Sequence, residues 1–299
     1  MNKLMQGVIV AMTTPFREDG NIDLESLKNQ VDFLIGKGVN CLYPLGTTGE
    51  MFLLTVPERK LVAQTVVEQA AGRLPVYIHV GALRTSEACE LAVHAHKIGA
   101  CGIAAVTPAY FSCSPRAIAQ YYKDLAAAAG PDFPLYLYAI PQCAANDISS
   151  DLAAELAAAL PQVVGIKYSG SDMLRLLNYI SIRGGSFSVL TGSDRLFFSA
   201  LTGGAQGMVS GCAGPLPEPF VAVYQAWQEG RLEDARRLQR TMTEVVELLG
   251  AGVDMAVFKE VLRRRGVTAT ARMRRPLLEL EPLAAEKLWQ GCQPYLGHA

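Results

Sequence analysis

Residues 163–170 read VVGIKYSG. This stretch predicts one strand of the fold, and it also contains a residue whose position is chemically unusual. The apolar run Val163 to Ile166 is bounded by Pro161 before it and by Ser169-Gly170 after it, which predicts a short, fully buried strand. Lys167 stands inside that strand. Burying an ammonium group is costly unless the group is paired or used, so this lysine requires an explanation.

The same pattern, a short apolar run that ends in small or polar residues, occurs eight times. The other seven runs are GVIVAMTTP at 7–15, VNCLYPLG at 39–46, PVYIHVG at 75–81, CGIAAVTP at 101–108, PLYLYAIP at 134–141, FSVLTG at 187–192 and QGMVSG at 206–211. Segments with helical period separate them, and Thr55-Val56-Pro57-Glu58 and Ser114-Pro115 provide helix start signals. Eight alternating strands and helices predict an α/β fold, a closed (β/α)8 TIM barrel.

We expect the barrel core to occupy residues 1–216. From residue 217 the pattern becomes helical only, so residues 217–299 are expected to form C-terminal helices packed on the barrel in a single structural unit. A doubly wound sheet is the competing fold. Such sheets usually have a glycine-rich dinucleotide loop after their first strand, and this chain has MTTPFREDG there.

Composition excludes several classes of protein. The chain has 299 residues, of which 50% are apolar and 18% charged, with a net charge of −1. No excess of positive charge indicates a nucleic-acid partner, and no segment approaches a membrane span. Its seven cysteines form no CxxC pair. These features favour a reduced, cytoplasmic enzyme without nucleic-acid or membrane partners.

Active sites of such barrels lie at the C-terminal ends of the strands, where this chain places an unusual set of residues. By strand order they are Gly46, Thr47, Thr48, Tyr110, Tyr138, Lys167, Gly192, Asp194 and Ser210. The Gly46–Gly49 turn can form an anion-binding concavity, or it can be an ordinary loop. Tyr138 can shuttle a proton, or it can pack the barrel together with Tyr136, which shares its face.

Lys167 is the centre of the functional hypothesis. Desolvation disfavours the charged form of a lysine in an apolar barrel, and a neutral amine attacks ketones to give an iminium that acts as an electron sink. Alternatively, the side chain extends to the rim or pairs with a buried carboxylate. The other eight lysines are expected in the N-terminal tail, at polar helix positions or at helix ends.

A metal-dependent aldolase or a phosphate-binding barrel is a second class of enzyme to consider. The four histidines, His79, His94, His96 and His298, are poorly placed for it. His94 and His96 stand two apart on a helix and point to different sides. We therefore expect no metal and no bound cofactor.

Three motifs together resemble the dihydrodipicolinate synthase/N-acetylneuraminate lyase family of pyruvate-dependent class I aldolases. They are GTTGE at 46–50, YAIP at 138–141 and IKYS at 166–169. The resemblance implies that Lys167 forms a covalent imine with pyruvate, that Tyr138 transfers protons beside it, and that Thr47 and Thr48 bind the pyruvyl carboxylate.

The resemblance also implies an oligomer. Tyr110 would serve the site of the neighbouring subunit in a tight dimer, commonly paired into a homotetramer. Gly192 and Asp194 would line the pocket, and we add Gly46 and Ser210 as substrate-binding candidates.

Two departures from the family pattern bear on the substrate. Lysine-pathway synthases have an arginine five positions after the tyrosine, where this chain has Cys143, and Ala139 replaces the usual asparagine. A thiol cannot replace a bidentate guanidinium, which argues against aspartate semialdehyde as the main substrate. Sialate lyases have an Asp-Glu pair where this chain has Asp194-Arg195. We expect Arg195 to face solvent and Glu50 to be a structural partner of its loop.

The sequence thus predicts a Schiff-base lyase that condenses pyruvate with an aldehyde or releases it from a 2-oxo-3-deoxy sugar acid or related hydroxy-2-oxo acid. Three alternatives stay open. They are dihydrodipicolinate synthesis, dehydration of a sugar acid through the same imine, and an oxo-acid-binding barrel without turnover.

Overall fold

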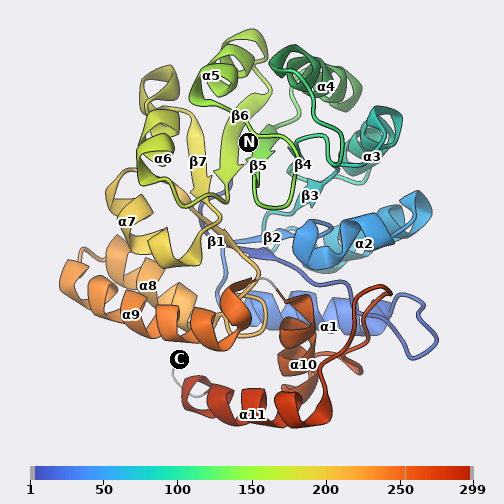
Figure 1. The fold of residues 1–299 in the computed structure, drawn as a ribbon, viewed down its shortest axis with the longest axis vertical. Coiled ribbons are helices and arrows are strands. Elements are labelled where there is room, and N and C mark those ends of the chain that lie inside the picture. The colour runs from blue at the N-terminus through green and yellow to red at the C-terminus, as the bar shows by residue number, and fades with distance from the viewer. Residues whose placement is uncertain (1–3, 253, 297–299) are drawn as a thin grey trace.

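Eight parallel strands form the centre of the molecule in this computed structural model, which describes residues 4–252 and 254–296 (Figure 1). Each of the eight apolar runs contains one strand, so all eight strand predictions are confirmed. The strands are β1 (Gly7–Ala11), β2 (Cys41–Tyr43), β3 (Tyr77–His79), β4 (Gly102–Val106), β5 (Leu135–Ala139), β6 (Val163–Tyr168), β7 (Ser188–Thr191) and β8 (Gly207–Ser210).

The strands form a nearly closed barrel. Their order is β2-β1-β8-β7-β6-β5-β4-β3, which leaves β2 and β3 as the two ends of the sheet. A parallel bridge between Leu42 and Val76 joins those ends, and the Leu42 N–H donates to the Pro75 carbonyl at 3.0 Å. The (β/α)8 TIM barrel is confirmed.

A ring of helices surrounds the strands (Figure 1). These helices are α1 (Leu24–Gly36), α2 (Val56–Ala70), α3 (Thr85–Lys97), α4 (Pro115–Ala129), α5 (Ser150–Ala159), α6 (Met173–Ile180), α7 (Phe197–Thr202) and α8 (Glu218–Gln228). The expected start signals are in place, because Thr55 and Glu58 form a capping box on α2 and Ser114 caps α4. Among the described residues, no helix is both long and apolar enough to cross a membrane.

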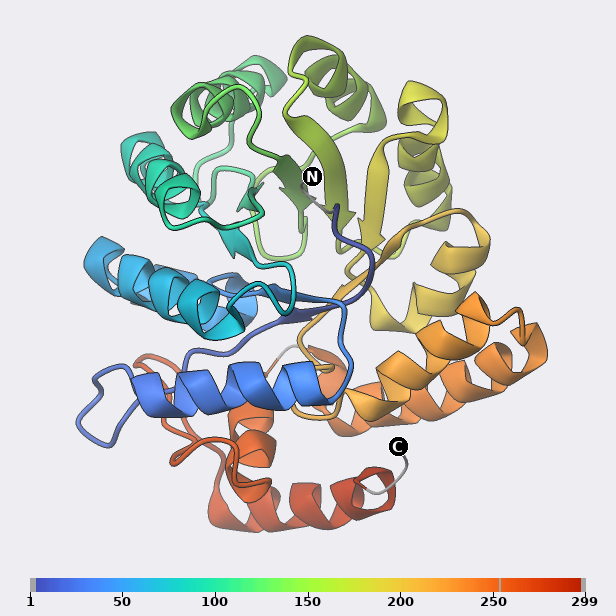
Figure 2. The same ribbon diagram turned by 180° about the vertical axis from the view of Figure 1, so that it is seen from behind.

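Three further helices follow the eighth βα unit. They are α9 (Leu232–Leu248), α10 (Met255–Arg264) and α11 (Pro282–Cys292). Helix α8 contacts β1 and so completes the ring, and α9 packs along α8. The view from behind shows α10 and α11 on the side of the barrel that α1 covers (Figure 2).

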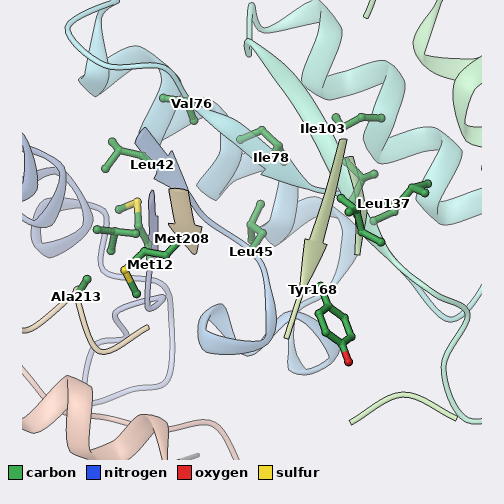
Figure 3. Close-up of a cluster of buried hydrophobic side chains, with 14 of the residues drawn as sticks. Met12, Leu42, Leu45, Val76, Ile78, Ile103, Leu137, Tyr168, Met208 and Ala213 are labelled. Carbon is green, nitrogen blue, oxygen red and sulfur yellow. The ribbon is translucent and has the colours of Figure 1, made fainter. Parts of the chain in front are cut away.

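The two faces of the strands supply two separate cores. Outward-facing side chains such as Leu42, Ile103 and Leu137 belong to the layer between strands and helices (Figure 3). Inward-facing side chains, among them Tyr43 and Tyr136, fill the barrel. This alternation is the two-residue period of a strand.

Gly165 shows how closely the barrel interior is packed. A Cβ at this position would lie 2.5 Å from the ring of Tyr136 and 2.2 Å from the Ser188 carbonyl oxygen, so only glycine fits. The Tyr136 hydroxyl donates to the Ser188 Oγ at 2.9 Å. Because the interior is filled in this way, space for chemistry remains at the mouth of the barrel.

Candidate active site

Lys167 lies near the end of β6 and points into the barrel, with 6% of its surface exposed. Its register partner on β5 is Tyr138, and its Nζ lies 4.0 Å from the centroid of the Tyr138 ring. Among the residues described, no carboxylate lies within ion-pair distance of this Nζ. The side chain therefore neither extends to the rim nor pairs with a buried acid.

Tyr43 and His79 also lie beside Lys167 and Tyr138, and neither was among the predicted site residues. The Tyr43 ring centroid lies 5.4 Å from Lys167 Nζ. His79 stands edge-on to both Tyr43 and Tyr138. The two-residue period of VNCLYPLG could have revealed Tyr43, since it shares the inward face of β2 with Cys41.

His79 acts as a neutral spacer between the two tyrosines. Its Nδ1 lies 3.0 Å from the Leu45 carbonyl, and the Val106 N–H donates to its Nε2 at 3.1 Å. Burial lowers the pKa of His79 well below its usual value, and the charges of Arg59 and Lys167 lower it further. A neutral imidazole with a proton on Nδ1 satisfies both contacts.

The predicted hydroxyl-rich turn is a 3₁₀ turn, η1 (Thr47–Gly49), which follows β2 and Gly46. The Gly49 N–H donates to the Gly46 carbonyl and the Glu50 N–H donates to the Thr47 carbonyl, each at 3.0 Å. Thr14 fixes the turn from the β1 side, because its hydroxyl donates to the Gly49 carbonyl at 2.8 Å. Thr48 packs on Gly211, where an added Cβ would lie 2.9 Å from its Oγ1.

Asp194 and Ser210 meet where β7 and β8 end, next to β6 and its Lys167. Burial raises the pKa of Asp194 to about 6, although hydrogen bonds from Ser210 and Cys212 and the charge of Lys167 act in the other direction. Gly192 lies beside Ser169, where a Cβ would approach the Ser169 Oγ to 2.1 Å. Arg195 is exposed and pairs with Glu247, as expected for a residue that faces solvent.

Three buried polar atoms around the mouth have no hydrogen-bond partner among the described residues. They are the Thr47 Oγ1 and the Asp194 Oδ1, and the buried Tyr43 hydroxyl, whose neighbours include Arg59 and Tyr122. Buried polar atoms in native proteins are nearly always paired, so a cluster of exceptions calls for an explanation. A polar ligand at this mouth would offer partners to the Thr47 and Asp194 oxygens.

Tyr110 lies apart from this group. It is 83% exposed, and its ring stacks edge-to-face on that of Phe111, which is 73% exposed. Its backbone is left-handed, with a φ of 73°. Within one chain, the structure thus brings together the predicted residues of β2, β5, β6, β7 and β8, but not Tyr110.

One expectation about the lysines is wrong. Lys259, in α10, is 2% exposed, and burial lowers its pKa to about 8. Its ammonium group pairs with the Glu50 carboxylate and donates to the Arg272 carbonyl at 2.8 Å. The helical pattern around Lys259 did not reveal this burial because the surface that covers it comes from distant parts of the chain. Glu50 is a structural partner, as expected.

The arrangement of possible metal ligands bears on the hypothesis of a metal-dependent enzyme. Within residues 4–252 and 254–296, no three His, Cys, Asp or Glu side chains are grouped as metal ligands. Both ring nitrogens of His79 are engaged by the backbone. His298 lies outside the described residues.

A (β/α)8 barrel with a buried lysine and a hydroxyl-rich turn at its C-terminal mouth has the architecture of a barrel enzyme. Residues 4–291 match the dihydrodipicolinate synthetase family, and the chain belongs to this family.

Relatives of the chain include enzymes with different substrates. It is 31% identical to a probable 2-dehydro-3-deoxy-D-pentonate aldolase of Escherichia coli K12, over 96% of each chain. It is also 31% identical to an N-acetylneuraminate lyase of Mediterraneibacter gnavus, over 91% of this chain and 86% of the relative.

Among solved structures, a prophage protein of E. coli K12 belonging to the dihydrodipicolinic acid synthase family, in complex with pyruvate, superposes with a TM-score of 0.92. The two are 28% identical over 98% of this chain and 99% of that one. The family assignment makes the chain a lyase and points to pyruvate-dependent aldolase chemistry.

Proposed function

We propose that the protein is a class I aldolase that joins pyruvate to an aldehyde, or releases it from a 2-oxo-3-deoxy sugar acid or a related hydroxy-2-oxo acid, through an imine on Lys167. The observation that supports this most strongly is the state of Lys167. It is buried at the mouth, lies 4.0 Å from the Tyr138 ring, and has no carboxylate partner among the described residues. Such an amine has no structural task that accounts for its burial.

The reaction would start with attack of the Lys167 amine on the C2 carbonyl of pyruvate and loss of water. The resulting iminium makes the methyl protons acidic, so that one leaves and an enamine forms. Tyr138 would give its phenolic proton to the hydroxyl that leaves as water, accept the methyl proton as a phenolate, and later donate that proton to the oxygen of the aldehyde that the enamine attacks. The imine supplies the electron sink, so the scheme needs no separate cofactor.

The turn after β2 would hold the carboxylate of pyruvate. The Thr47 Oγ1 is buried without a hydrogen-bond partner in the part of the chain that the structure describes, and the N–H groups of a tight turn can surround an anion. Thr48, beside Gly211, would hold the turn against β8 and contribute its hydroxyl. Gly46, Gly192, Asp194 and Ser210 would form the remaining walls.

We further propose a dimer, or a pair of dimers, in which Tyr110 reaches the site of the neighbouring subunit. Tyr110 and Phe111 form an exposed aromatic tip on a left-handed backbone, and large exposed aromatic side chains are typical of contact surfaces. An αL tyrosine is strained, which is common where backbone strain serves function.

Synthesis of dihydrodipicolinate remains the weaker candidate. Cys143 is exposed at the mouth in the position where the synthases place an arginine, and a thiol gives an anionic aldehyde no charge to bind. A sugar-acid dehydratase would use the same imine and differ only in the leaving group. A binding barrel without turnover would form no enamine.

The proposal can be tested without knowing the aldehyde, by following deuterium exchange at the pyruvate methyl group in D₂O by proton NMR. The wild-type protein is expected to catalyse exchange, and Lys167→Met should not. Tyr138→Phe should slow exchange by about 10²-fold or more, because a positioned general base contributes that much. Lys123→Met, an exposed lysine on α4, is the matched control.

Two results would overturn the proposal. One is absence of exchange by folded wild-type protein with pyruvate and other small 2-oxo acids. The other is exchange at the wild-type rate by Lys167→Met.

A further inference from the structure

A cavity of about 260 Å³ opens beside Thr47 at the C-terminal mouth of the barrel. Four parts of the chain form its walls: the segment after β2, the ends of β4 and β5, and the C-terminal segment that follows α10. Representative lining residues are Phe52, Val106, Ala109, Ile140, Ala144 and Leu277.

The side chains that line this cavity offer few polar contacts. Nine of the twelve lining residues are apolar, and the exceptions are Thr47, Glu50 and Cys143. The Glu50 carboxylate is already engaged by Lys259, and it accepts from the Arg274 N–H at 3.0 Å. Burial raises the pKa of the Cys143 thiol, so the thiol is neutral and a weak partner. The buried Thr47 hydroxyl has no hydrogen-bond partner among the described residues.

The position of the cavity relates it to the reacting amine. Val106, Ile140 and Ala144 line it and also pack with Tyr138 in one buried cluster. In the sheet, Val106 pairs with Tyr138 and Tyr138 pairs with Lys167. The cavity therefore adjoins the tyrosine next to Lys167, and it shares Thr47 with the proposed carboxylate site.

We propose that this cavity binds the substituent of the aldehyde, and that this substituent is apolar, an aryl or branched alkyl group. The inference rests on the proposed function. It limits the hydroxy-2-oxo acids that the enzyme would make or cleave to those with an apolar tail. Hydroxyls of a sugar-derived aldehyde would find few partners here and would lose those they have in water. A hydrophobic pocket, in contrast, gains about 10–200-fold in specificity for each methylene group that it fits.

Lys167, Tyr138 and water supply every group that the condensation needs. The enamine C3 of the Lys167 adduct attacks the carbonyl carbon of the aldehyde, which forms one C–C bond and leaves an alkoxide. The proton that Tyr138 took from the methyl group goes to that alkoxide. Water then hydrolyses the iminium, which frees Lys167 and releases a 4-hydroxy-2-oxo acid with the apolar group on C4.

The test compares two aldehydes with pyruvate as the common partner. We expect kcat/KM for benzaldehyde to exceed that for glyceraldehyde by about tenfold or more. Deuterium exchange into pyruvate is measured on the same protein. Absence of exchange would count against the proposed function itself. If exchange occurs but kcat/KM for glyceraldehyde equals or exceeds that for benzaldehyde, the apolar subsite is contradicted and the proposed function is not.

Filling the cavity provides the second arm. Ala109→Phe places a ring in it from a half-buried loop position, and Cys143→Phe does so from an exposed position after β5. Each should lower benzaldehyde condensation at least tenfold relative to pyruvate exchange. Ala127→Phe, the same change at an exposed position of α4, is the matched control and should leave both rates unchanged.

A competing occupant is the Tyr110–Phe111 tip of a second copy of this chain. In that case the filling variants would alter the sedimentation coefficient and leave the ratio of condensation to exchange unchanged. That result would overturn the inference and assign the cavity to the subunit contact.

Discussion

At the scale of single residues, Lys167 is stabilised by aromatic faces rather than by a carboxylate. Its Nζ lies 4.0 Å from the Tyr138 ring centroid and 5.4 Å from that of Tyr43. A cation over an aromatic ring gains about 0.5–2 kcal/mol, less than a buried acid would provide. The amine thus stays available for reaction, and its charge lowers the pKa of the Asp194 carboxyl group against the effect of burial.

The Asp194 carboxyl group predicts how the stability of the protein depends on pH. Burial raises its pKa from 3.8 to about 6, so the folded state holds this proton more tightly than the unfolded state. The contribution of Asp194 to the stability of the folded state therefore falls as pH rises from 3.8 to about 6. Asp194→Asn removes the titration. The urea midpoint of the variant, relative to wild type, should be higher at about pH 7.5 than at about pH 4.5. A difference that is independent of pH would contradict this assignment.

At the scale of elements, α10 is tied to the substrate-binding turn by a buried ion pair. Glu50 directly follows η1, and its partner Lys259 lies in α10. Arg274 supports the same loop, since its guanidinium donates to the Leu53 carbonyl at 2.9 Å and to Glu58 at 2.8 Å. The C-terminal helices thus help to hold the Thr47–Gly49 turn in place.

Lys259→Met should destabilise the protein by about 3–5 kcal/mol, because it leaves the buried Glu50 charge without its partner. The double variant Glu50→Gln/Lys259→Met should recover much of this loss, since it removes both charges. Chemical denaturation measures both, with Lys123→Met as the exposed control. The KM for pyruvate should rise in Lys259→Met, as the turn is displaced. Equal stability of Lys259→Met and wild type would contradict the role of this pair.

Elements that depend on local patterns could be predicted from the sequence, whereas contacts between distant segments could not. Strand patterns gave the eight strands, and period two placed Tyr138 and Lys167 on inward faces. Helix caps such as Thr55 followed from local hydrogen bonding. The Glu50–Lys259 pair could not be predicted, because it depends on how α10 packs on a loop far away in sequence. The cavity beside Thr47 was not predicted either, since four separate segments build it.

At the scale of the whole molecule, the site within one chain is incomplete if Tyr110 serves a neighbour. Tyr110 is 83% exposed and shows no contact with Lys167 or Tyr138 in the described chain. A twofold dimer would exchange the two tyrosines reciprocally, because both subunits use the same surface.

Mixing two inactive variants tests this arrangement. Tyr110→Phe lacks the hydroxyl that its neighbour would use, and Lys167→Met lacks its own amine. After dissociation and reassociation of equal amounts, activity should return to about a quarter of wild type, because half of the dimers are mixed and each has one complete site. Recovery no greater than the mean of the two separate variants would place Tyr110 outside the neighbour's site.

Borohydride reduction traps an imine between Lys167 and pyruvate as a stable covalent adduct. The protein is incubated with pyruvate and sodium borohydride, and the reduced adduct is located by intact mass and peptide mapping. We predict one adduct per chain, on Lys167, and none in Lys167→Ala. Lys259, a second buried lysine, whose pKa burial lowers to about 8, serves as the internal control and should stay unmodified. An adduct on Lys259, or no adduct on folded wild-type protein, would contradict the account.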